Sequence, residues 1–354
     1  MKELDPYRLL RSLLFSLPPE VAHRWVIAAL RLRLPPAARA APPGSLRINA
    51  FGMNFSSPLG MAAGFDKNAE ACDALLAQGF GFVETGTVTP QAQQGNPRPR
   101  LFRLAEDEAV INRMGFNGGG VEAFVRNLRR HRRSGIVGAN IGKNRDSADA
   151  VRDYVTLLEA VSPHVDYVTV NISSPNTAGL RALQERDALD ALLQALMEKR
   201  EALPRRLPLL LKIAPDLTDG QREAVAEVTL ARKVDGLIVG NTTTARPPGL
   251  KSPWHGETGG LSGKPLFSLS TEMLRDMYRL TGGRVPLVGV GGISSAADAY
   301  AKIRAGATLL QLYTGIIYQG FGLVREIHEG LAEYLARDGF AALAEAVGTE
   351  KRDG

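Results

Sequence analysis

The sequence predicts an α/β fold, a (β/α)₈ TIM barrel that carries a small N-terminal α-helical extension. Eight short apolar runs rich in β-branched residues follow Pro58, and helical patterns separate them. The runs are continuously apolar rather than alternating, which indicates strands buried on both faces, as in a parallel sheet. Eight such units in about 280 residues are typical of a closed barrel.

Composition places the chain among ordinary globular proteins. Its 354 residues are 44% hydrophobic and 23% charged, which allows a sizeable core and argues against disorder. The net charge of +6 and the pI near 9.5 are compatible with nucleic acid, anionic lipid or an anionic small molecule, and equally with a solvated arginine-rich surface. The single cysteine, Cys72, excludes an intramolecular disulfide, and its apolar neighbours favour simple packing.

Residues 6 to 34 are expected to form two short helices. Leu10, Leu13 and Leu17 recur at helical spacing in the first, and Pro18-Pro19 separates it from the second. Further along the chain we expect helices that include residues 187–203 and 218–230. The eight strands are expected at Leu59–Ala63, Phe82–Thr87, Ile136–Ile141, Tyr167–Ile172, Leu209–Ile213, Gly236–Gly240, Pro286–Val290 and Leu309–Tyr313.

The N-terminal segment has features of a lipid-interface hairpin. Its first forty residues contain seven Lys or Arg against three acids, and Trp25 lies on an apolar helical face. These faces suit a membrane surface, although they could instead pack on the main domain. No run reaches the roughly 18 apolar residues that are needed to cross a bilayer. Because residues 35–46 have the composition of a linker, we divide the chain into an extension, residues 1–45, and a barrel domain, residues 46–354.

The C-terminal ends of all eight predicted strands carry polar side chains or glycines. In a barrel these ends meet at one mouth, where the active site of this fold lies. Any one polar residue could be a cap or a turn, but eight strand ends together indicate a binding site. The polar residues are Asp66, Lys67, Thr85, Thr87, Asn140, Lys143, Asn171, Ser173, Ser174, Asn176, Lys212, Asn241 and Thr242.

The end of the seventh strand predicts an anion site. Gly289, Gly291 and Gly292 allow the backbone to approach a ligand closely, and Ser294 is placed to cap the next helix. The N–H groups of that helix would then face a phosphate, which this fold commonly holds after strands seven and eight. A helix cap alone is the alternative. These glycines come late in the chain and lack the full spacing of a dinucleotide fingerprint.

Four asparagines suggest recognition of a planar heterocycle. Asn112, Asn171, Asn176 and Asn241 each offer two donors and an acceptor, so together they could read the edges of an imide ring. Lys67 would suit a carboxylate on such a ring. Taken singly, each asparagine is more commonly a turn or cap residue.

Nine motifs in series resemble the class 2 dihydroorotate dehydrogenases. The similarity covers essentially the whole chain, including the N-terminal helices, and the series is specific although each motif alone is weak. The motifs are AAGFDKN (Ala62–Asn68), ETGTVTPQ (Glu84–Gln91), NPRPRLFRL (Asn96–Leu104), INRMGFNGG (Ile111–Gly119), NIGKN (Asn140–Asn144), NISSPNT (Asn171–Thr177), LKIAPDL (Leu211–Leu217), TGGLSGKPL (Thr258–Leu266) and GVGGIS (Gly289–Ser294).

The resemblance implies an FMN-dependent enzyme that oxidises (S)-dihydroorotate to orotate in de novo pyrimidine (UMP) biosynthesis. A membrane quinone, ubiquinone or menaquinone, would be the final electron acceptor. The implied flavin contacts are Ala63, Gly64, Thr87, Asn140, Asn171, Lys212, Gly240, Gly263, Gly292, Tyr313 and Thr314. The implied substrate contacts are Lys67, Asn112, Arg113, Met114, Gly115, Phe116, Asn171, Asn176, Asn241 and Thr242.

The resemblance assigns Ser174 as the base that takes the C5 proton while C6 gives a hydride to the flavin. Because serine is a weak base, Thr177 and a water would relay the proton, and Phe116 would shield the site. Without the resemblance, an N-cap before Pro175 is an equally good interpretation of Ser174. The class 1 relatives place a cysteine in this loop, so the serine favours class 2.

Class 2 enzymes dock on the membrane through their N-terminal helices, which form a quinone tunnel. The resemblance therefore implies a peripheral protein on the cytoplasmic face of the cell membrane, with His23 either lining the tunnel or facing solvent. Ala178 and Gly240 stand where many relatives have proline and threonine, and Gly240 could loosen a flavin contact. We expect no nucleic-acid partner and no metal, because the five histidines are scattered.

Three alternatives remain at this point. A flavin-dependent tRNA dihydrouridine synthase would share the barrel and suit the basic pI, but it predicts a cysteine acid and a C-terminal RNA-binding domain. A catalytically inactive scaffold at the membrane predicts broken site residues. A class 1 enzyme that uses fumarate or NAD predicts a cysteine base and no N-terminal hairpin.

Overall fold

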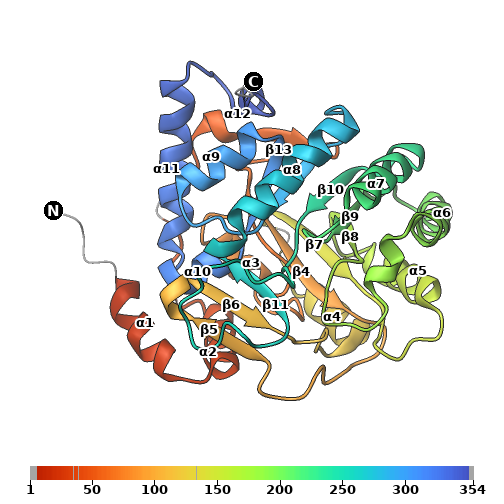
Figure 1. Cartoon of the computed structure of the whole chain (residues 1–354), viewed down its shortest axis with the longest axis horizontal. Coiled ribbons are helices and arrows are strands. Elements are labelled where there is room, and N and C mark those ends of the chain that lie inside the picture. The colour runs from red at the N-terminus through yellow and green to blue at the C-terminus, as the bar shows by residue number, and fades with distance from the viewer. Residues whose placement is uncertain (1–5, 35, 39, 133, 351–354) are drawn as a thin grey trace.

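The computed structural model describes residues 6–34, 36–38, 40–132 and 134–350. Eight parallel strands close a barrel in chain order, and the last strand pairs with the first (Figure 1). All eight predicted strands are confirmed, with ends that differ by one to two residues in several of them. They are β3 (Leu59–Met61), β4 (Phe82–Val88), β7 (Ile136–Ile141), β8 (Tyr167–Asn171), β9 (Leu209–Ile213), β10 (Gly236–Val239), β12 (Leu287–Val290) and β13 (Ala307–Leu312).

Helices follow the strands and cover the outside of the barrel (Figure 1). The two expected at 187–203 and 218–230 are confirmed as α6 and α7, and the Thr218 side chain forms a capping box with Gln221 at the start of α7. The helices are α3 (Cys72–Leu76), α4 (Gly120–Leu128), α5 (Ala150–Val161), α6 (Arg186–Glu201), α7 (Asp219–Ala231), α8 (Phe267–Thr281), α9 (Ala296–Arg304), α10 (Thr314–Gln319), α11 (Gly322–Arg337) and α12 (Leu343–Ala346).

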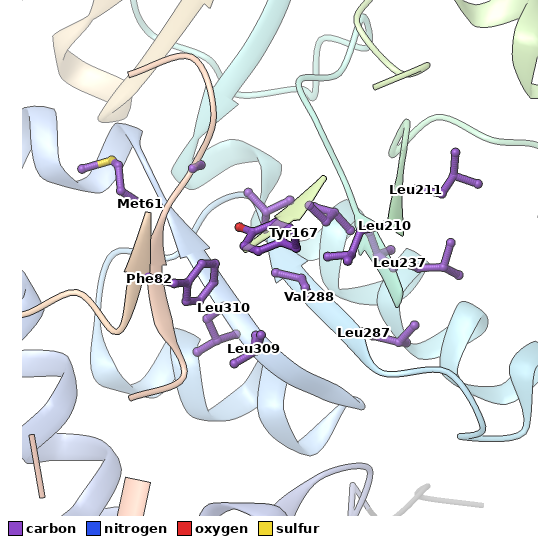
Figure 2. Close-up of a cluster of buried hydrophobic side chains, with 14 of the residues drawn as sticks. Met61, Phe82, Tyr167, Leu210, Leu211, Leu237, Leu287, Val288, Leu309 and Leu310 are labelled. Carbon is purple, nitrogen blue, oxygen red and sulfur yellow. The ribbon is translucent and has the colours of Figure 1, made fainter. Parts of the chain in front are cut away.

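The barrel interior is apolar at the N-terminal ends of its strands. The Phe82 ring packs edge to face on Phe55, with centroids 5.3 Å apart, and lies near Leu309 and Leu310 of β13 (Figure 2). Glycines make room for the large rings: a Cβ on Gly60 would lie 2.4 Å from the Phe82 ring, and one on Gly138 would lie 2.1 Å from the Tyr167 ring. This plug closes the barrel below the mouth.

Two small sheets lie outside the barrel, and the sequence analysis did not predict them. Strands β1 (Ile48–Ala50) and β2 (Met53–Phe55) form an antiparallel hairpin. Strands β5 (Leu101–Leu104), β6 (Ala109–Asn112) and β11 (Gly260–Gly263) form a sheet in the order β11-β6-β5. Each of these strands has three or four residues, which is too short for its alternation to stand out from a loop.

The predicted N-terminal helices are confirmed as α1 (Pro6–Ser16) and α2 (Pro19–Arg31). They lie beside β5 and α10 (Figure 1). The Glu20 carboxylate accepts two hydrogen bonds from Arg100, at 2.9 and 3.0 Å, and the Tyr7 hydroxyl donates to the Ile317 carbonyl at 2.6 Å. None of the described helices is long and apolar enough to span a bilayer.

The N-terminal segment, formed by α1, α2 and the residues just after them, keeps large apolar side chains in solvent. Among the described residues, six large hydrophobic side chains are exposed, and five of them belong to this N-terminal segment. They are Leu10, Leu13, Trp25, Leu32 and Leu34, with exposed fractions from 50% to 71%. We call these five residues the apolar face of the extension.

Candidate active site

The C-terminal ends of the barrel strands open into one cavity of about 710 Å³. Side chains of α1, α2 and the three-stranded sheet form its other wall, so the extension lies over the barrel mouth. Most of the predicted site residues line this cavity. They are Ala63, Gly64, Lys67, Thr87, Asn112, Met114, Gly115, Phe116, Asn171, Ser174, Asn176, Lys212, Asn241, Thr242, Gly263, Gly292, Tyr313 and Thr314.

Four predicted site residues do not line the cavity. Asn140 is fully buried behind it and accepts a hydrogen bond from the Thr87 hydroxyl at 2.5 Å. Arg113 turns toward the surface, where its guanidinium lies 2.7 Å from the Glu257 carboxylate. The remaining two are Thr177, which is buried, and Gly240.

A buried carboxylate, Glu84, supports the site through Asn140 and Gln311, and the sequence analysis did not assign it to the site. Its oxygens accept hydrogen bonds from Asn140 at 2.8 Å, Tyr167 at 3.2 Å, Thr169 at 3.0 Å and Gln311 at 3.0 Å. Four donors around one buried carboxylate hold the surrounding strands in a single arrangement. A charged residue inside a strand whose other residues are uncharged was the local signal that could have identified it.

Lys212 comes from β9 and is also buried. Burial lowers the pKa of its ammonium group, and the negative charge of Glu84 partly opposes this effect. Within the described residues, the Lys212 ammonium has no hydrogen-bond partner. It therefore presents a desolvated amino group with free hydrogen-bond donors to whatever binds in the cavity.

The predicted asparagines are held by one another and by hydroxyl groups. The Asn171 amide donates to the Thr87 hydroxyl at 3.0 Å, and its carbonyl accepts from the Ser173 hydroxyl at 2.9 Å. Asn241 donates to the same Ser173 hydroxyl at 2.8 Å. Asn176 similarly donates to the side-chain carbonyl of Asn112, at 3.2 Å. These contacts fix the direction in which each amide faces the cavity.

Lys67 lies on the loop after β3, and its ammonium donates to the Asn117 side chain at 2.8 Å. Burial, together with the positive charge of Arg100, lowers the pKa of Lys67 to about 8.

His23 of α2 also lines the cavity, and its Nε2 donates to the Phe65 carbonyl at 2.7 Å. Burial and the charge of Lys67 lower the pKa of His23 to about 4, so its imidazole is neutral near pH 7.

The loop after β8 carries Ser174 and Thr177, both buried. The Ser174 hydroxyl accepts a long hydrogen bond, 3.3 Å, from the Asn176 backbone N–H, whereas the Thr177 hydroxyl has no partner among the described residues. A buried hydroxyl without a partner is costly, which favours a ligand or water at this point. Phe116 has a left-handed backbone, with φ of 51°, and Gln93 binds its carbonyl at 3.2 Å.

Glycines near the ends of β11 and β12 form a backbone cradle. Gly263, Gly291 and Gly292 have φ values of 98°, 107° and 77°, which few other residues adopt. A Cβ on Gly292 would lie 2.4 Å from the Cα of Phe267, the first residue of α8. The cradle therefore excludes side chains and leaves backbone N–H groups beside the start of a helix, as in a phosphate site.

The expected helix cap at Ser294 is wrong by one residue. Ser295 caps α9, because its hydroxyl accepts from the Asp298 backbone N–H at 3.1 Å. Ser294 instead donates its hydroxyl to the Asp298 carboxylate at 2.9 Å. The two adjacent serines are locally equivalent in sequence, and the direction in which the chain enters the helix decides between them.

The fold and the site together define a (β/α)₈-barrel enzyme whose mouth combines buried lysines, amide side chains and a glycine cradle. The dihydroorotate dehydrogenase family model matches residues 45–335. The chain belongs to the dihydroorotate dehydrogenase family.

Curated relatives match along nearly the whole chain. The dihydroorotate dehydrogenase (quinone) of Parvibaculum lavamentivorans is 55% identical and covers 98% of this chain and 99% of its own. The protein of the same name from Azorhizobium caulinodans is 53% identical, covering 99% of this chain and all of its own. The solved structure of the ligand-free type dihydroorotate dehydrogenase of Eimeria tenella is 41% identical, with a TM-score of 0.92 over 94% of this chain and 99% of that one.

Proposed function

We propose that this protein oxidises (S)-dihydroorotate to orotate in pyrimidine biosynthesis, with FMN as the hydride acceptor and a membrane quinone as the final electron acceptor. The observation that carries the proposal is the cavity itself. It brings Lys67, Ser174 and Lys212 together with a glycine cradle, from separate strands and loops of the barrel and from the small sheet beside it. The names of the curated relatives support the reaction and the quinone.

The residues present fit FMN. The cradle of Gly263, Gly291 and Gly292 suits a phosphate, and the unpaired ammonium of Lys212 suits the electron-rich pyrimidine end of a flavin ring. Thr87 and Asn171 are held by hydrogen bonds where they could line such a ring. When bound, FMN supplies the group that accepts the hydride leaving C6 of dihydroorotate.

The substrate would lie between the asparagines and Lys67. The Lys67 ammonium binds the carboxylate, and the amides of Asn112, Asn176 and Asn241 bind the imide edges. Ser174 takes the proton from C5 as the C5–C6 double bond forms. The partnerless hydroxyl of Thr177 is the next group available to carry that proton away, through a water.

The extension would attach the protein to the membrane surface and admit the quinone. Its apolar face suits the lipid interface, and the neutral imidazole of His23 lines the passage between α2 and the barrel mouth. We place the protein on the cytoplasmic face of the cell membrane. We also propose residue 45 as the boundary between the extension and the barrel domain.

The test is anaerobic reduction of the purified protein in mild detergent. We expect dihydroorotate to bleach the visible flavin band and a quinone, but not fumarate or NAD, to restore it. Ser174→Ala should slow bleaching on the order of 10²- to 10⁴-fold, the usual contribution of a general base. Ser162→Ala, which removes a hydroxyl from the end of α5, is the matched control.

Other outcomes of this test exclude specific parts of the proposal. Restoration by fumarate or NAD alone would reject the quinone and leave the extension without a role. Absence of bound flavin, or of bleaching, would reject the reaction and favour a scaffold or an RNA-modifying enzyme.

A further inference from the structure

A fully buried lysine, Lys302, lies on α9 outside the cavity, and the proposed reaction does not use it. Its ammonium donates to the hydroxyls of Ser270 at 2.8 Å and Thr271 at 2.9 Å, and lies 5.1 Å from the centroid of the Phe267 ring. Lysine is almost never fully buried unless its charge has a role or a partner. Its direct hydrogen-bond partners here are neutral hydroxyls of α8.

Ser270 connects this lysine to the glycine cradle. The Ser270 hydroxyl accepts from Lys302 and lies within hydrogen-bonding distance of two carbonyls, that of Gly291 at 2.9 Å and that of Phe267 at 3.0 Å. The Phe267 carbonyl also accepts from the Thr271 hydroxyl at 2.7 Å, which favours Gly291 as the acceptor of the Ser270 hydrogen. Because the ammonium can only donate, it forces the Ser270 hydrogen away from itself and toward its carbonyl acceptors. Asp298, one turn before Lys302 on α9, accepts from the Ser294 backbone N–H at 2.9 Å and ties down the other end of the loop.

The position of the Gly291 carbonyl also sets the direction of the Gly292 N–H group. In a trans peptide the C=O and N–H point in opposite directions, so a carbonyl held against Ser270 turns the Gly292 N–H away from α8. Gly292 lines the cavity, and its N–H donates no hydrogen bond within the described part of the chain. The N–H is thus left free for an anion.

We propose that Lys302 is a positioning residue for the flavin phosphate: through Ser270 it sets the Gly291–Gly292 peptide. The inference rests on the proposed FMN function. Burial lowers the pKa of Lys302 to about 7, and the charge of Asp298 opposes this. A phosphate dianion in the cradle favours the charged ammonium further.

Comparison of FMN with riboflavin, which lacks the phosphate, tests the proposal. Flavin is removed from the purified protein, and each compound is titrated back while flavin fluorescence is followed. Lys302→Met keeps an unbranched side chain of similar length without the charge. We expect its Kd for FMN to rise on the order of 10- to 100-fold, the scale of a buried charge-assisted hydrogen bond, with the Kd for riboflavin unchanged.

Two further variants distinguish loss of the connection from Lys302 through Ser270 to Gly291 from a general loss of stability. Ser270→Ala removes the connection but keeps the lysine, and we expect a smaller loss that is again confined to FMN. Thr281→Val removes another buried hydroxyl of α8, one that donates to the Met277 carbonyl, and should leave both affinities unchanged.

Equal weakening of FMN and riboflavin in Lys302→Met, or no change in either, would overturn the inference. If Lys302→Met does not fold, the same comparison in Ser270→Ala decides. A wild-type protein that binds the two flavins equally would instead reject the phosphate site, and with it the cofactor assignment in the proposed function.

Discussion

The barrel mouth and the N-terminal extension depart from the usual distribution of side chains in opposite ways. The mouth buries polar groups: Glu84, Asn140 and Lys212 are each at most 4% exposed. The extension exposes apolar groups, and Trp25 and Leu32 are 63% and 71% exposed. Both arrangements cost stability in an isolated protein, because buried charges lose hydration and exposed apolar surface orders water.

The two regions also differ in how they are held. The polar groups of the mouth are connected by short hydrogen bonds between several strands, so their positions are set before any ligand arrives. The extension is joined to the barrel domain by separate contacts of single side chains along both helices, such as those of Tyr7, Arg11, Glu20 and His23. This difference suits a rigid site for chemistry beside a separable surface for lipid and a large apolar substrate.

Of the effects that distinguish the two regions, the largest is expected for the positive charge of Lys67 at the barrel mouth. Lys67→Met should weaken orotate binding about a hundredfold, because a charge-assisted hydrogen bond to the carboxylate is lost. In the wild type, the lowered pKa of about 8 means that binding above this pH requires uptake of a proton. The affinity should then be highest below pH 8 and fall by up to about tenfold per pH unit above it.

Calorimetric titration with orotate between pH 7 and 9 measures both effects. Lys199→Met, on the outer helix α6, is the control and should behave as the wild type. An affinity that does not change with pH would show that Lys67 does not bind the carboxylate as an ammonium ion.

An intermediate effect is expected on the apolar face of the extension. Trp25→Ala should reduce binding to anionic lipid vesicles about tenfold, since a large apolar side chain contributes roughly 1.5–3 kcal/mol when it leaves water. Turnover with a short, soluble quinone should be unchanged. Trp254→Ala is a matched control, because Trp254 is 49% exposed but lies outside the extension. If Trp25→Ala and Trp254→Ala lose vesicle binding equally, the extension has no special role in binding lipid.

The smallest expected effect concerns the junction between the two regions. Burial alone raises the pKa of Glu20, but its hydrogen bonds and charge interactions with Arg100 outweigh this and lower it overall. The contact therefore stabilises docking above the ordinary pKa of 4.5 and is lost as the pH falls through the lowered value. Glu20→Gln should speed proteolysis after residue 34 a few-fold at pH 7, as measured by timed digestion.

Glu329→Gln provides the control for this experiment, because Glu329 lies on α11 in an exposed pair with Arg325. If Glu20→Gln and the wild type are cleaved at the same rate, the Arg100 contact does not hold the extension in place.

Prediction from sequence succeeded where structure depends on neighbours along the chain. The strands of the barrel are continuous apolar runs bounded by Gly, Pro and polar residues. Their positions could therefore be predicted from short stretches of sequence. Strand β11 was missed because its partner lies far away: Ser262 pairs with Val110, roughly 150 residues earlier. Glu84 was overlooked as a site residue although it is the one charged residue of strand β4.

The sequence by itself determined the barrel, the order of its strands, the two N-terminal helices and the motifs gathered at the mouth. Periodic burial and turn residues encode these features within short segments. Only the tertiary structure decided that Asn112 lines the cavity while Arg113 turns to Glu257, and that the extension lies over the mouth with His23 facing inward. These outcomes depend on which surfaces meet, and no local pattern specifies such contacts between distant segments.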